Sequence, residues 1–376
     1  MEIPFNKPFL TGRELEYIGQ AHRNMHLSGD GPFTKRCHEW LERATGCRRA
    51  LLTHSGTGAL EMAAILAGTR AGDEIIMPSF TFVSTANAFV LRGGVPVFVD
   101  VREDTLNIDE TKIEAAITPR TKAIVVVHYA GVACDMDAIG AIARRHGLML
   151  IEDAAQALGA AYRGRPLGSF GDVAALSFHE TKNLISGEGG ALLVNSPDLT
   201  ERAEIVREKG TNRSRFLRGD VDKYTWVDVG SSFLASDILA AFLWAQLEAA
   251  DSINQRRQAL WRRYHEGFAG AERAGLVRRP VVPPEASANA HTYFLMLPDA
   301  AARTRFIQTL RREAIHAVFH YVPLHSAPAG LRFGRASGPM TVTDSVSARL
   351  ARLPLWIGLE AEQDRVIERV QRALGG

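Results

Sequence analysis

A lysine and an aspartate follow two separate apolar segments of the chain. Lys182 lies shortly after VAALS (173–177), and Asp153 ends LMLIED (148–153). Such side chains are rarely buried unless a partner or a ligand compensates their charge, so we expect reactive groups on a rigid frame. Pyridoxal phosphate needs this pair, because its aldehyde carbon bonds to a lysine amine and a carboxylate keeps its pyridine nitrogen protonated. The two residues therefore predict a pyridoxal phosphate site.

The phosphate of such a cofactor needs its own donors, and THSGTGALEM (53–62) is the best candidate. An apolar segment ends there, Ser55, Gly56 and Thr57 turn the chain, and a helical pattern begins at once. Amides at a helix N-terminus bind phosphate well. The chain has no GxxxxGK[ST] and no complete GxGxxG motif, so neither a P-loop nor a dinucleotide-binding fingerprint is supported.

The elements that must position these residues alternate between short apolar runs and helical patterns. The apolar runs are ALLT, EIIMP, PVFVD, AIVVVH, LMLIE, VAALS and ALLV, between residues 50 and 194. This alternation predicts an α/β domain with a mostly parallel sheet, buried on both faces, and right-handed crossovers. Ligands bind beyond the carboxyl ends of such strands, where the sequence places Ser55, Pro78, His128, Asp153 and Ser177.

The rest of the chain predicts further helices and a second unit. Helical patterns cover 12–25, 135–146 and 199–210, and Ser236 is a candidate N-cap of a helix whose apolar face suits a core or a subunit interface. The segment 211–226 reads as a long polar loop. After a change of composition near 278–286, TYFLML, a helix over 299–313 and a closing helix over 360–374 predict a smaller α/β unit. We expect a large domain, 1–250, and a small one, 251–376.

Composition limits the class of protein. The chain has 376 residues, 46% of them hydrophobic, and a formal net charge of +2, which argues against a nucleic-acid-binding polycation. Its cysteines, Cys37, Cys47 and Cys134, predict free thiols in a reducing compartment. Cys37 and His38 lack the further ligands of a zinc site. Because no signal peptide and no membrane-spanning apolar run is evident, we expect a cytoplasmic protein without metal, nucleic acid or membrane as partner.

The segments HSGTGAL, PSFTFVSTANA, HYAG, EDAAQ, SFHETKN, GEGGAL and HYVPLH occur in the order and spacing of one enzyme family. In these segments, over nearly its whole length, the chain resembles the sugar aminotransferases of the DegT/DnrJ/EryC1/StrS family. The resemblance implies the fold type I, aspartate aminotransferase-like architecture and pyridoxal 5'-phosphate as cofactor. It also implies a homodimer with active sites at the subunit interface.

The resemblance assigns roles to cofactor-binding residues. Lys182 becomes the residue that bonds to the cofactor and later transfers a proton, and Asp153 the partner of the pyridine nitrogen. Gln156 is expected at the phenolic oxygen of the ring. Phe82 is expected to stack on the ring, although a place in the core is equally consistent with its sequence. The phosphate ligands are expected to be Ser55, Gly56, Thr57, Ser177 and His179.

One segment departs from the family pattern. Many relatives carry GxNYR, in which an asparagine from the neighbouring subunit contacts the phosphate. Here the aligned text is GSSFL, 230–234, so Ser232 stands in the place of the asparagine and Leu234 in that of the arginine. Ser232 is therefore a candidate phosphate ligand.

Substrate contacts are expected from two further segments. HYVPLH supplies His320, Tyr321 and His325, which could cover a hexose and its keto group; a histidine satisfied within the core is the alternative for each. The loop 211–226 supplies candidates for a diphosphate or for donor carboxylates, although a solvated surface would also explain its charges. These candidates are Asn212, Arg213, Lys223 and Tyr224.

Within the family, the segments 82–94, 107–111, 128–134, 207–214 and 222–226 most resemble those of enzymes that make dTDP-4-amino-4,6-dideoxy-D-galactose. This implies amino transfer from L-glutamate, which becomes 2-oxoglutarate, to dTDP-4-keto-6-deoxy-D-glucose for a surface polysaccharide. One alternative is a nucleotide-sugar dehydratase of the same family, but such relatives carry histidine in place of the cofactor-bonding lysine, and Lys182 speaks against it. Another is a non-catalytic regulatory protein that binds the cofactor.

Overall fold

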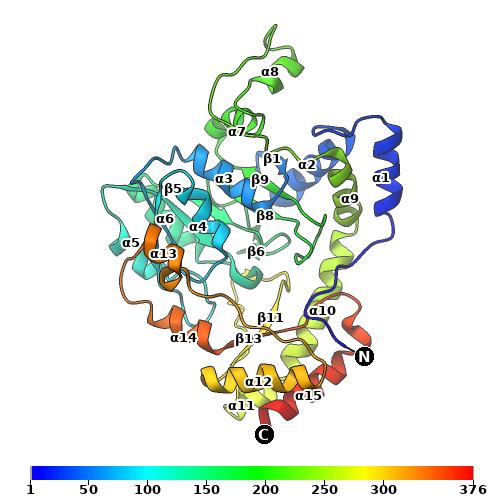
Figure 1. Ribbon diagram of the computed structural model, residues 1–376, viewed down its shortest axis with the longest axis vertical. Helices are drawn as coiled ribbons and strands as arrows, with labels where there is room; N and C mark the ends of the chain where they lie inside the picture. The colour runs from blue at the N-terminus through cyan, green and yellow to red at the C-terminus, as the bar shows by residue number, and fades with distance from the viewer. Residues whose placement is uncertain (1, 376) are drawn as a thin grey trace.

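The computed structural model describes residues 2–375 and is built on one large sheet (Figure 1). The sheet has eight strands. Their spatial order is β1 (Arg49–Thr53), β9 (Gly190–Val194), β8 (Val173–Ser177), β5 (Met149–Asp153), β4 (Thr121–Val127), β2 (Glu74–Pro78), β3 (Val95–Val99) and β12 (Arg335–Ala336). All the apolar runs expected as strands are strands of this sheet, which confirms the α/β architecture.

The sheet is mostly parallel, with one exception that matters for the site. Strands β8, β5, β4, β2, β3 and β12 pair in parallel, whereas β9 is antiparallel to both β8 and β1. Expecting ALLV to continue a parallel alternation was therefore wrong for this strand. The connection 178–189 contains no helix. It leaves the sheet at the carboxyl end of β8 and re-enters it beside that end as β9, so Ser177 at its start pairs with Gly190 at its end.

Helices cover both faces of the sheet, as the continuous apolar strands require. One face packs against α3 (Gly56–Leu66), α4 (Val83–Val90) and α7 (Thr200–Arg207). The other packs against α1 (Glu14–Arg23), α2 (Pro32–Thr45), α5 (Ile113–Ala116), α6 (Met136–His146) and α9 (Asp237–Glu248). Alternate strand residues serve the two faces: Leu51 lies in the first core and Leu52 in the second.

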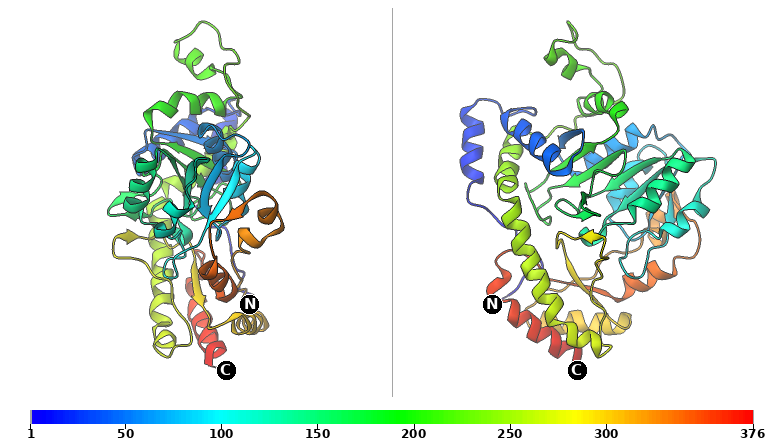
Figure 2. Two further views of the ribbon diagram at one scale, coloured as in Figure 1. Left: turned by 90° about the vertical axis from the view of Figure 1, so that its left-hand side faces the viewer. Right: turned by 180° about the vertical axis from the view of Figure 1, so that it is seen from behind.

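The C-terminal part forms a smaller core below the sheet. The long helix α10 (Ala250–Gly267) leads into it (Figure 2). A two-stranded antiparallel sheet of β11 (Tyr293–Met296) and β13 (Leu350–Leu353) packs with α11 (Ala269–Arg273), α12 (Ala300–Arg312) and α15 (Gln363–Gly375). The short elements α13 (Pro328–Phe333), α14 (Thr341–Arg349) and the sheet of β6 (Ala161–Tyr162), β7 (Arg165–Pro166) and β10 (Ala286–Ser287) complete the fold.

The chain crosses between the two parts more than once. Ile3 lies in the C-terminal core, where it bridges Ile315, and β12 of the C-terminal part extends the large sheet beside β3. The expected division after residue 250 falls at the junction of α9 and α10 and stays a prediction.

The segment 211–226 contains a helix, α8 (Arg213–Arg218), so describing it as loop alone was wrong. It projects from α7 at the end of the molecule opposite the C-terminal part (Figure 1). Its arginines are paired: Arg213 with Glu208 at 3.0 Å and Arg218 with Glu204 at 2.7 Å. The charge of this segment is therefore partly compensated within the chain.

Cys37 and His38 lie in α2, a helix that the sequence analysis did not assign. His38 Nε2 accepts a hydrogen bond from the Leu52 amide at 2.9 Å, and Cys37 Sγ donates to the Ala240 carbonyl at 3.4 Å. Both side chains are buried, and all three cysteines are free. These residues hold α2 to the sheet and to α9.

None of the helices in residues 2–375 combines the length and the apolar character needed to cross a lipid bilayer.

Glu74 connects the edge strand β12 to the sheet. Its buried carboxylate accepts hydrogen bonds from Arg335 at 2.8 Å, from Thr118 at 2.8 Å and from Arg120. Arg335, whose hydrogen bond is the largest cause, lowers the pKa of Glu74 to about 2. Since this pKa is lower than in the unfolded chain, ionised Glu74 stabilises the fold above pH ~4.5, and the stabilisation is lost as the pH falls toward 2.

We expect Glu74→Gln to lower the free energy of unfolding by about 2 kcal/mol at pH 7, because a charged acceptor of several hydrogen bonds is lost. The difference from wild type should shrink at pH 3. Urea unfolding at both pH values measures it, and Glu39→Gln, at an exposed position of α2, is the matched control. An equal difference at pH 7 and pH 3 would contradict the assigned role.

Candidate active site

A cavity of about 710 Å³ opens at the carboxyl ends of β5 and β8. Its other walls come from α3, α4 and the C-terminal segments 318–322 and 352–355. Eleven of the expected site residues line it: Ser55, Gly56, Thr57, Phe82, Asp153, Gln156, Ser177, His179, Lys182, His320 and Tyr321. The topology thus brings to one place residues that lie as far apart as 55 and 321 in the sequence.

Lys182 enters the cavity from the connection between β8 and β9. Its amide donates to the His179 carbonyl at 2.9 Å, which fixes the backbone just beyond the strand. Burial lowers the pKa of its amine to about 8, Asp153 opposes the shift and Arg352 adds to it. Roughly a tenth of the amines are then neutral at pH 7, so Lys182 can act as nucleophile and base near neutral pH.

Asp153 ends β5 and is buried. Its Oδ2 accepts from the Thr85 hydroxyl at 2.7 Å, and its Oδ1 from the Ala155 amide at 3.2 Å. Burial raises the pKa of Asp153, while the hydrogen bond from Thr85 opposes the shift. A cation beside this carboxylate would lower its pKa again, which suits a protonated pyridine nitrogen.

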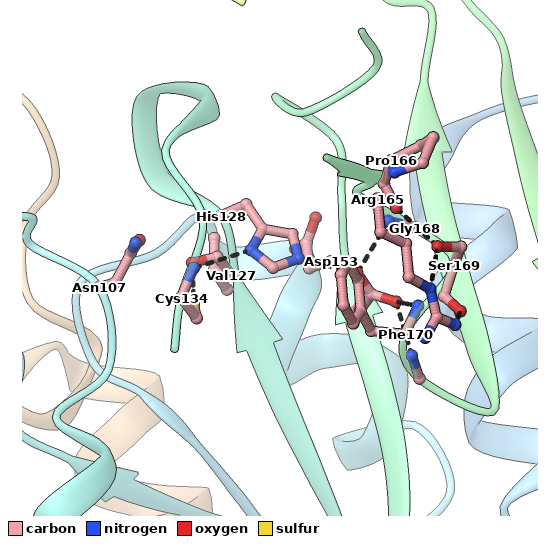
Figure 3. A network of polar contacts seen from close by, with 12 residues as sticks. Asn107, Val127, His128, Cys134, Asp153, Arg165, Pro166, Gly168, Ser169 and Phe170 are labelled. Atoms are coloured by element: carbon pink, nitrogen blue, oxygen red, sulfur yellow. Dashed lines mark hydrogen bonds and ion pairs between the residues drawn. The ribbon is translucent and has the colours of Figure 1, made fainter. Parts of the chain in front are cut away.

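Behind Asp153, a buried network fixes the end of β5 (Figure 3). Glu152 Oε2 lies 2.9 Å from His128 Nε2, and the carboxylate accepts the amides of Gly168, Phe170 and Gly171. Burial acts to raise the pKa of Glu152, but these hydrogen bonds prevail and lower it. The Cys134 amide donates to His128 Nδ1 at 3.2 Å, so the ring hydrogen lies on Nε2, toward Glu152.

The turn from β1 into α3 brings two hydroxyl groups and a glycine, Ser55, Gly56 and Thr57, to the wall of the cavity. The Ser55 hydroxyl caps α3 by accepting from the Gly58 amide at 3.0 Å, and the Thr57 hydroxyl lies 2.8 Å from that of Ser84 in α4. A Cβ on Gly56 would lie 2.8 Å from Ser177 Cβ, and one on Gly190 would lie 2.5 Å from the Gly56 nitrogen. Because these two glycines lack a Cβ atom, the turn can lie directly against Ser177 and Gly190, and larger residues would block this contact.

Gln156 and Phe82 lie on two sides of the cavity. Gln156 Oε1 accepts from the Ala130 amide at 2.7 Å, and Nε2 donates to the Tyr321 hydroxyl at 3.1 Å. The Phe82 side chain is 56% exposed and its ring lies 6.4 Å from that of Tyr321. The core alternative for Phe82 is therefore excluded, and its ring is available to a ligand.

The C-terminal wall is aromatic. His320 Nδ1 lies 2.9 Å from the Tyr129 hydroxyl, and burial lowers the pKa of His320, so its ring stays neutral. Burial raises the pKa of Tyr321. His179 also lines the cavity, and its Nδ1 lies 2.9 Å from the Thr181 hydroxyl.

Six of the expected residues do not line the cavity within one chain: Asn212, Arg213, Lys223, Tyr224, Ser232 and His325. His325 Nδ1 instead contacts the Ser79 hydroxyl at 2.8 Å. The other five belong to the segment 208–232, in which α8 projects away from the large sheet (Figure 1).

Other residues at the site have no sequence signal that would have revealed them. Thr85 supports Asp153 although it resembles an ordinary helix residue. His291 and Arg352 line the cavity from C-terminal segments without a recognisable motif, and His291 Nδ1 contacts Asn183 Oδ1 at 3.1 Å. Only the folded chain brings them to the cavity.

Comparison with known proteins decides the family. The DegT/DnrJ/EryC1/StrS aminotransferase family matches residues 9–371. The chain belongs to this family. It is 34% identical to the spore coat polysaccharide biosynthesis protein SpsC of Bacillus subtilis, over 100% of this chain and 97% of that protein. It is also 34% identical to the GDP-perosamine synthase of Caulobacter vibrioides, over 98% of this chain and 97% of that protein.

One similar solved structure is named as the form with pyridoxal phosphate (PLP). The PLP form of a putative sugar aminotransferase, Spr1654 of Streptococcus pneumoniae, superposes with a TM-score of 0.91 at 26% identity, covering 100% of this chain and 99% of that one. The DegT family member described here is a transaminase with the fold type I architecture. It uses pyridoxal phosphate, and its substrates are a sugar and an amino donor and acceptor pair.

The cavity fits this cofactor. The turn into α3, with Gly56 and Ser177, would hold the phosphate, Asp153 the pyridine nitrogen and Lys182 the aldehyde carbon. The bound cofactor supplies an electron sink for the carbon that gains or loses the amino group. Asp153 would keep a positive charge on the ring, and the lowered pKa of Lys182 would let its amine accept and return a proton at Nζ.

We expect the attachment of added pyridoxal phosphate to the apoprotein to become about fivefold faster from pH 7 to pH 8, as more of the Lys182 amine becomes neutral. Lys182→Ala should show no attachment at this site. Borohydride trapping followed by mass spectrometry measures both, with Lys122→Ala, at an exposed residue, as control. A tenfold rise, which a lysine amine with an unshifted pKa would give, would rule out the lowered pKa.

Proposed function

We propose that this enzyme transfers the amino group of L-glutamate to the 4-keto carbon of a nucleotide-linked deoxysugar. The acceptor we favour is dTDP-4-keto-6-deoxy-D-glucose, which gives dTDP-4-amino-4,6-dideoxy-D-galactose. The observation that carries the proposal is the placement of Lys182 and Asp153 in one cavity of about 710 Å³, a volume in the range of pockets that hold small molecules. The sequence segments quoted above support the choice of sugar.

The walls of the cavity suggest the roles of the remaining residues. Neutral His320 and Tyr321 would face the hexose from the C-terminal side, while Phe82 would cover the cofactor ring. Gln156 would orient the phenolic oxygen through Nε2, which its Oε1 contact to Ala130 holds in place. His179 and Ser55 would complete the phosphate end. Each of these groups binds or orients, which leaves proton transfer to Lys182.

A second acceptor deserves the same test, because one relative at 34% identity is named GDP-perosamine synthase. A GDP-linked 4-keto sugar would use the same keto-group chemistry at Lys182. The two hypotheses differ in the base that the enzyme recognises, and none of the contacts described above selects between them.

We expect wild-type protein with L-glutamate to have a kcat/KM for dTDP-4-keto-6-deoxy-D-glucose at least tenfold higher than for the GDP-, UDP- or CDP-linked analogues or 3-keto isomers. This ratio corresponds to a difference of about 1.4 kcal/mol in activation free energy. Mass spectrometry and NMR of the products measure it, with Lys182→Ala as the inactive control. A preference for the GDP-linked sugar would replace the favoured acceptor by the second. A protein that leaves every keto sugar unchanged would refute both.

We further propose a cytoplasmic homodimer in which the segment 208–232 of one subunit reaches the cavity of the other. The support is the exposed apolar surface of this segment, which no part of residues 2–375 covers: Trp226 is 78% exposed, Leu217 62% and Tyr224 52%. Such a patch on a projecting segment is typical of an interface. Burial there would bring Asn212, Arg213, Lys223, Tyr224 and Ser232 toward a second site.

Mixing two inactive variants tests the shared site. We expect Lys182→Ala and the double variant Lys223→Ala, Tyr224→Ala each to be inactive as homodimers. If subunits exchange, an equal mixture should regain about a quarter of wild-type activity, because half of its dimers are mixed and each mixed dimer has one site with both parts intact. Light scattering measures the oligomeric state. A monomer, or mixing without any recovery despite exchange, would refute the shared site.

A further inference from the structure

The segment 288–292, between β10 and β11, passes the cavity and contributes His291 and Thr292 to its lining. Arg257, which is buried on α10, holds this segment by its main chain. Its Nε donates to the Ala290 carbonyl at 3.2 Å, and its Nη2 donates to the His291 carbonyl at 2.6 Å. Because both acceptors are backbone oxygens, these contacts fix the path of the segment beside the cavity.

Asn289, in the middle of this segment, forms hydrogen bonds with both the nitrogen and the oxygen of its side chain. It is 1% exposed, and its Nδ2 donates to the Gln156 carbonyl at 2.8 Å and to the Leu158 carbonyl at 3.0 Å. Its Oδ1 accepts from the His291 amide at 3.1 Å. A reversed amide would place an oxygen against two carbonyl oxygens, so the side chain has one favourable orientation.

The main chain of Asn289 reaches the segment that carries the lysine. Its carbonyl accepts a hydrogen bond from Asn183 Nδ2 at 2.8 Å, and Asn183 directly follows Lys182. Asn183 Oδ1 lies 3.1 Å from His291 Nδ1, so both ends of the Asn183 amide are held. Asn289 therefore links the main chain at Gln156 to the residue beside Lys182.

The HYAG segment, 128–131, leaves room for the same residue. Gly131 has a φ of +77°, and a Cβ atom there would collide with Asn289 Oδ1, so glycine is required at this position. The preceding residue, Ala130, donates its amide to Gln156 Oε1 at 2.7 Å. Gln156 is thus held by its side chain through Ala130 and by its main chain through Asn289.

Asn289 itself does not line the cavity, but it holds two segments whose residues are placed at neighbouring groups of the cofactor. Gln156 is proposed for the phenolic oxygen and Lys182 for the aldehyde carbon, and the pyridoxal ring carries these two groups on adjacent carbons. A shift of one residue relative to the other would therefore misalign a contact next to the reacting carbon.

On the basis of the proposed role of Gln156, we propose that Asn289 is a positioning residue for the transamination reaction. It fixes the main chain at Gln156 relative to the segment that carries Lys182. Its effect on the cofactor passes through Gln156 on one side and through Asn183 on the other. The two sides can be measured separately.

Binding of the cofactor without its bond to the lysine isolates the Gln156 side. In the Lys182→Ala background, we expect Asn289→Ala to raise the Kd of pyridoxal phosphate about tenfold, because two buried carbonyls lose their donor. Gln156→Ala should raise this Kd by a similar factor. Combining both substitutions should raise it no more than about twofold beyond either alone, because both act on one contact. Absorbance titration measures each Kd.

Two further variants separate positioning from lost stability. Asn289→Asp keeps the acceptor for the His291 amide but not the donors, so it should raise the Kd as Asn289→Ala does. The matched control is Gln363→Ala, because Gln363 is also a buried amide, and its Nε2 donates to the Leu260 carbonyl at 2.6 Å in the C-terminal core. We expect Gln363→Ala to lower Tm about as much as Asn289→Ala and to leave the Kd unchanged.

The rate of cofactor attachment tests the Lys182 side. With Lys182 present and pyridoxal phosphate at saturation, we expect Asn183→Ala to slow attachment about fivefold, the effect of one lost hydrogen bond. In the Lys182→Ala background, the same substitution should change the Kd by less than about twofold, because Gln156 keeps its own contacts. Borohydride trapping followed by mass spectrometry measures the rate.

Each contrary result has its own meaning. A lowered Tm of Asn289→Ala with an unchanged Kd would make Asn289 a structural residue only and would overturn the proposal. Losses that add up when Asn289→Ala and Gln156→Ala are combined, or an attachment rate that Asn183→Ala leaves unchanged, would overturn it too. An unchanged Kd in Gln156→Ala would instead refute the contact proposed between Gln156 and the phenolic oxygen.

Discussion

The site depends on keeping two opposite charges away from water at the ends of neighbouring strands. Burial lowers the pKa of Lys182 and raises that of Asp153, so each side chain is driven toward its neutral form. Each group alone would cost stability, because a buried charge is poorly solvated. Such a cost is sustained only where the surrounding fold is rigid, and β5 and β8 lie in the centre of the large sheet.

The rigidity beneath Asp153 comes from a second buried pair. Glu152 points to the opposite face of β5 from Asp153, where His128 and three backbone amides satisfy its carboxylate. Adjacent residues of one strand thus have different roles: Glu152 fixes the end of the strand, whereas Asp153 accepts hydrogen bonds only from the Thr85 hydroxyl and one backbone amide. With one hydrogen bond to each oxygen, the Asp153 carboxylate keeps the capacity to accept another from a ligand.

Much of the fold and of the candidate site could be predicted from the sequence, for physical reasons. Apolar runs specify strands because both faces of the sheet are covered, and the residues that end those runs converge at one edge, which located Asp153, Ser177 and the turn at Gly56. The antiparallel direction of β9 was not predictable, because an apolar run carries no direction. Arg352 and Thr85 were missed because their roles come from tertiary contacts. The segment 208–232 was located in sequence, but a single chain does not bring it to the cavity.

The connection between β8 and β9 affects how the substrate specificity of such an enzyme can change. Because residues 178–189 leave and rejoin the sheet at the paired residues Ser177 and Gly190, the segment that carries Lys182 is held at both ends by strands that lie against the turn from β1 into α3. The wall with His320 and Tyr321 belongs to a different part of the chain. On the proposed assignment of that wall to the sugar, replacements there would change which sugar is accepted without moving the Lys182 amine. On that assignment, the chemical step and the choice of sugar depend on separate parts of the chain.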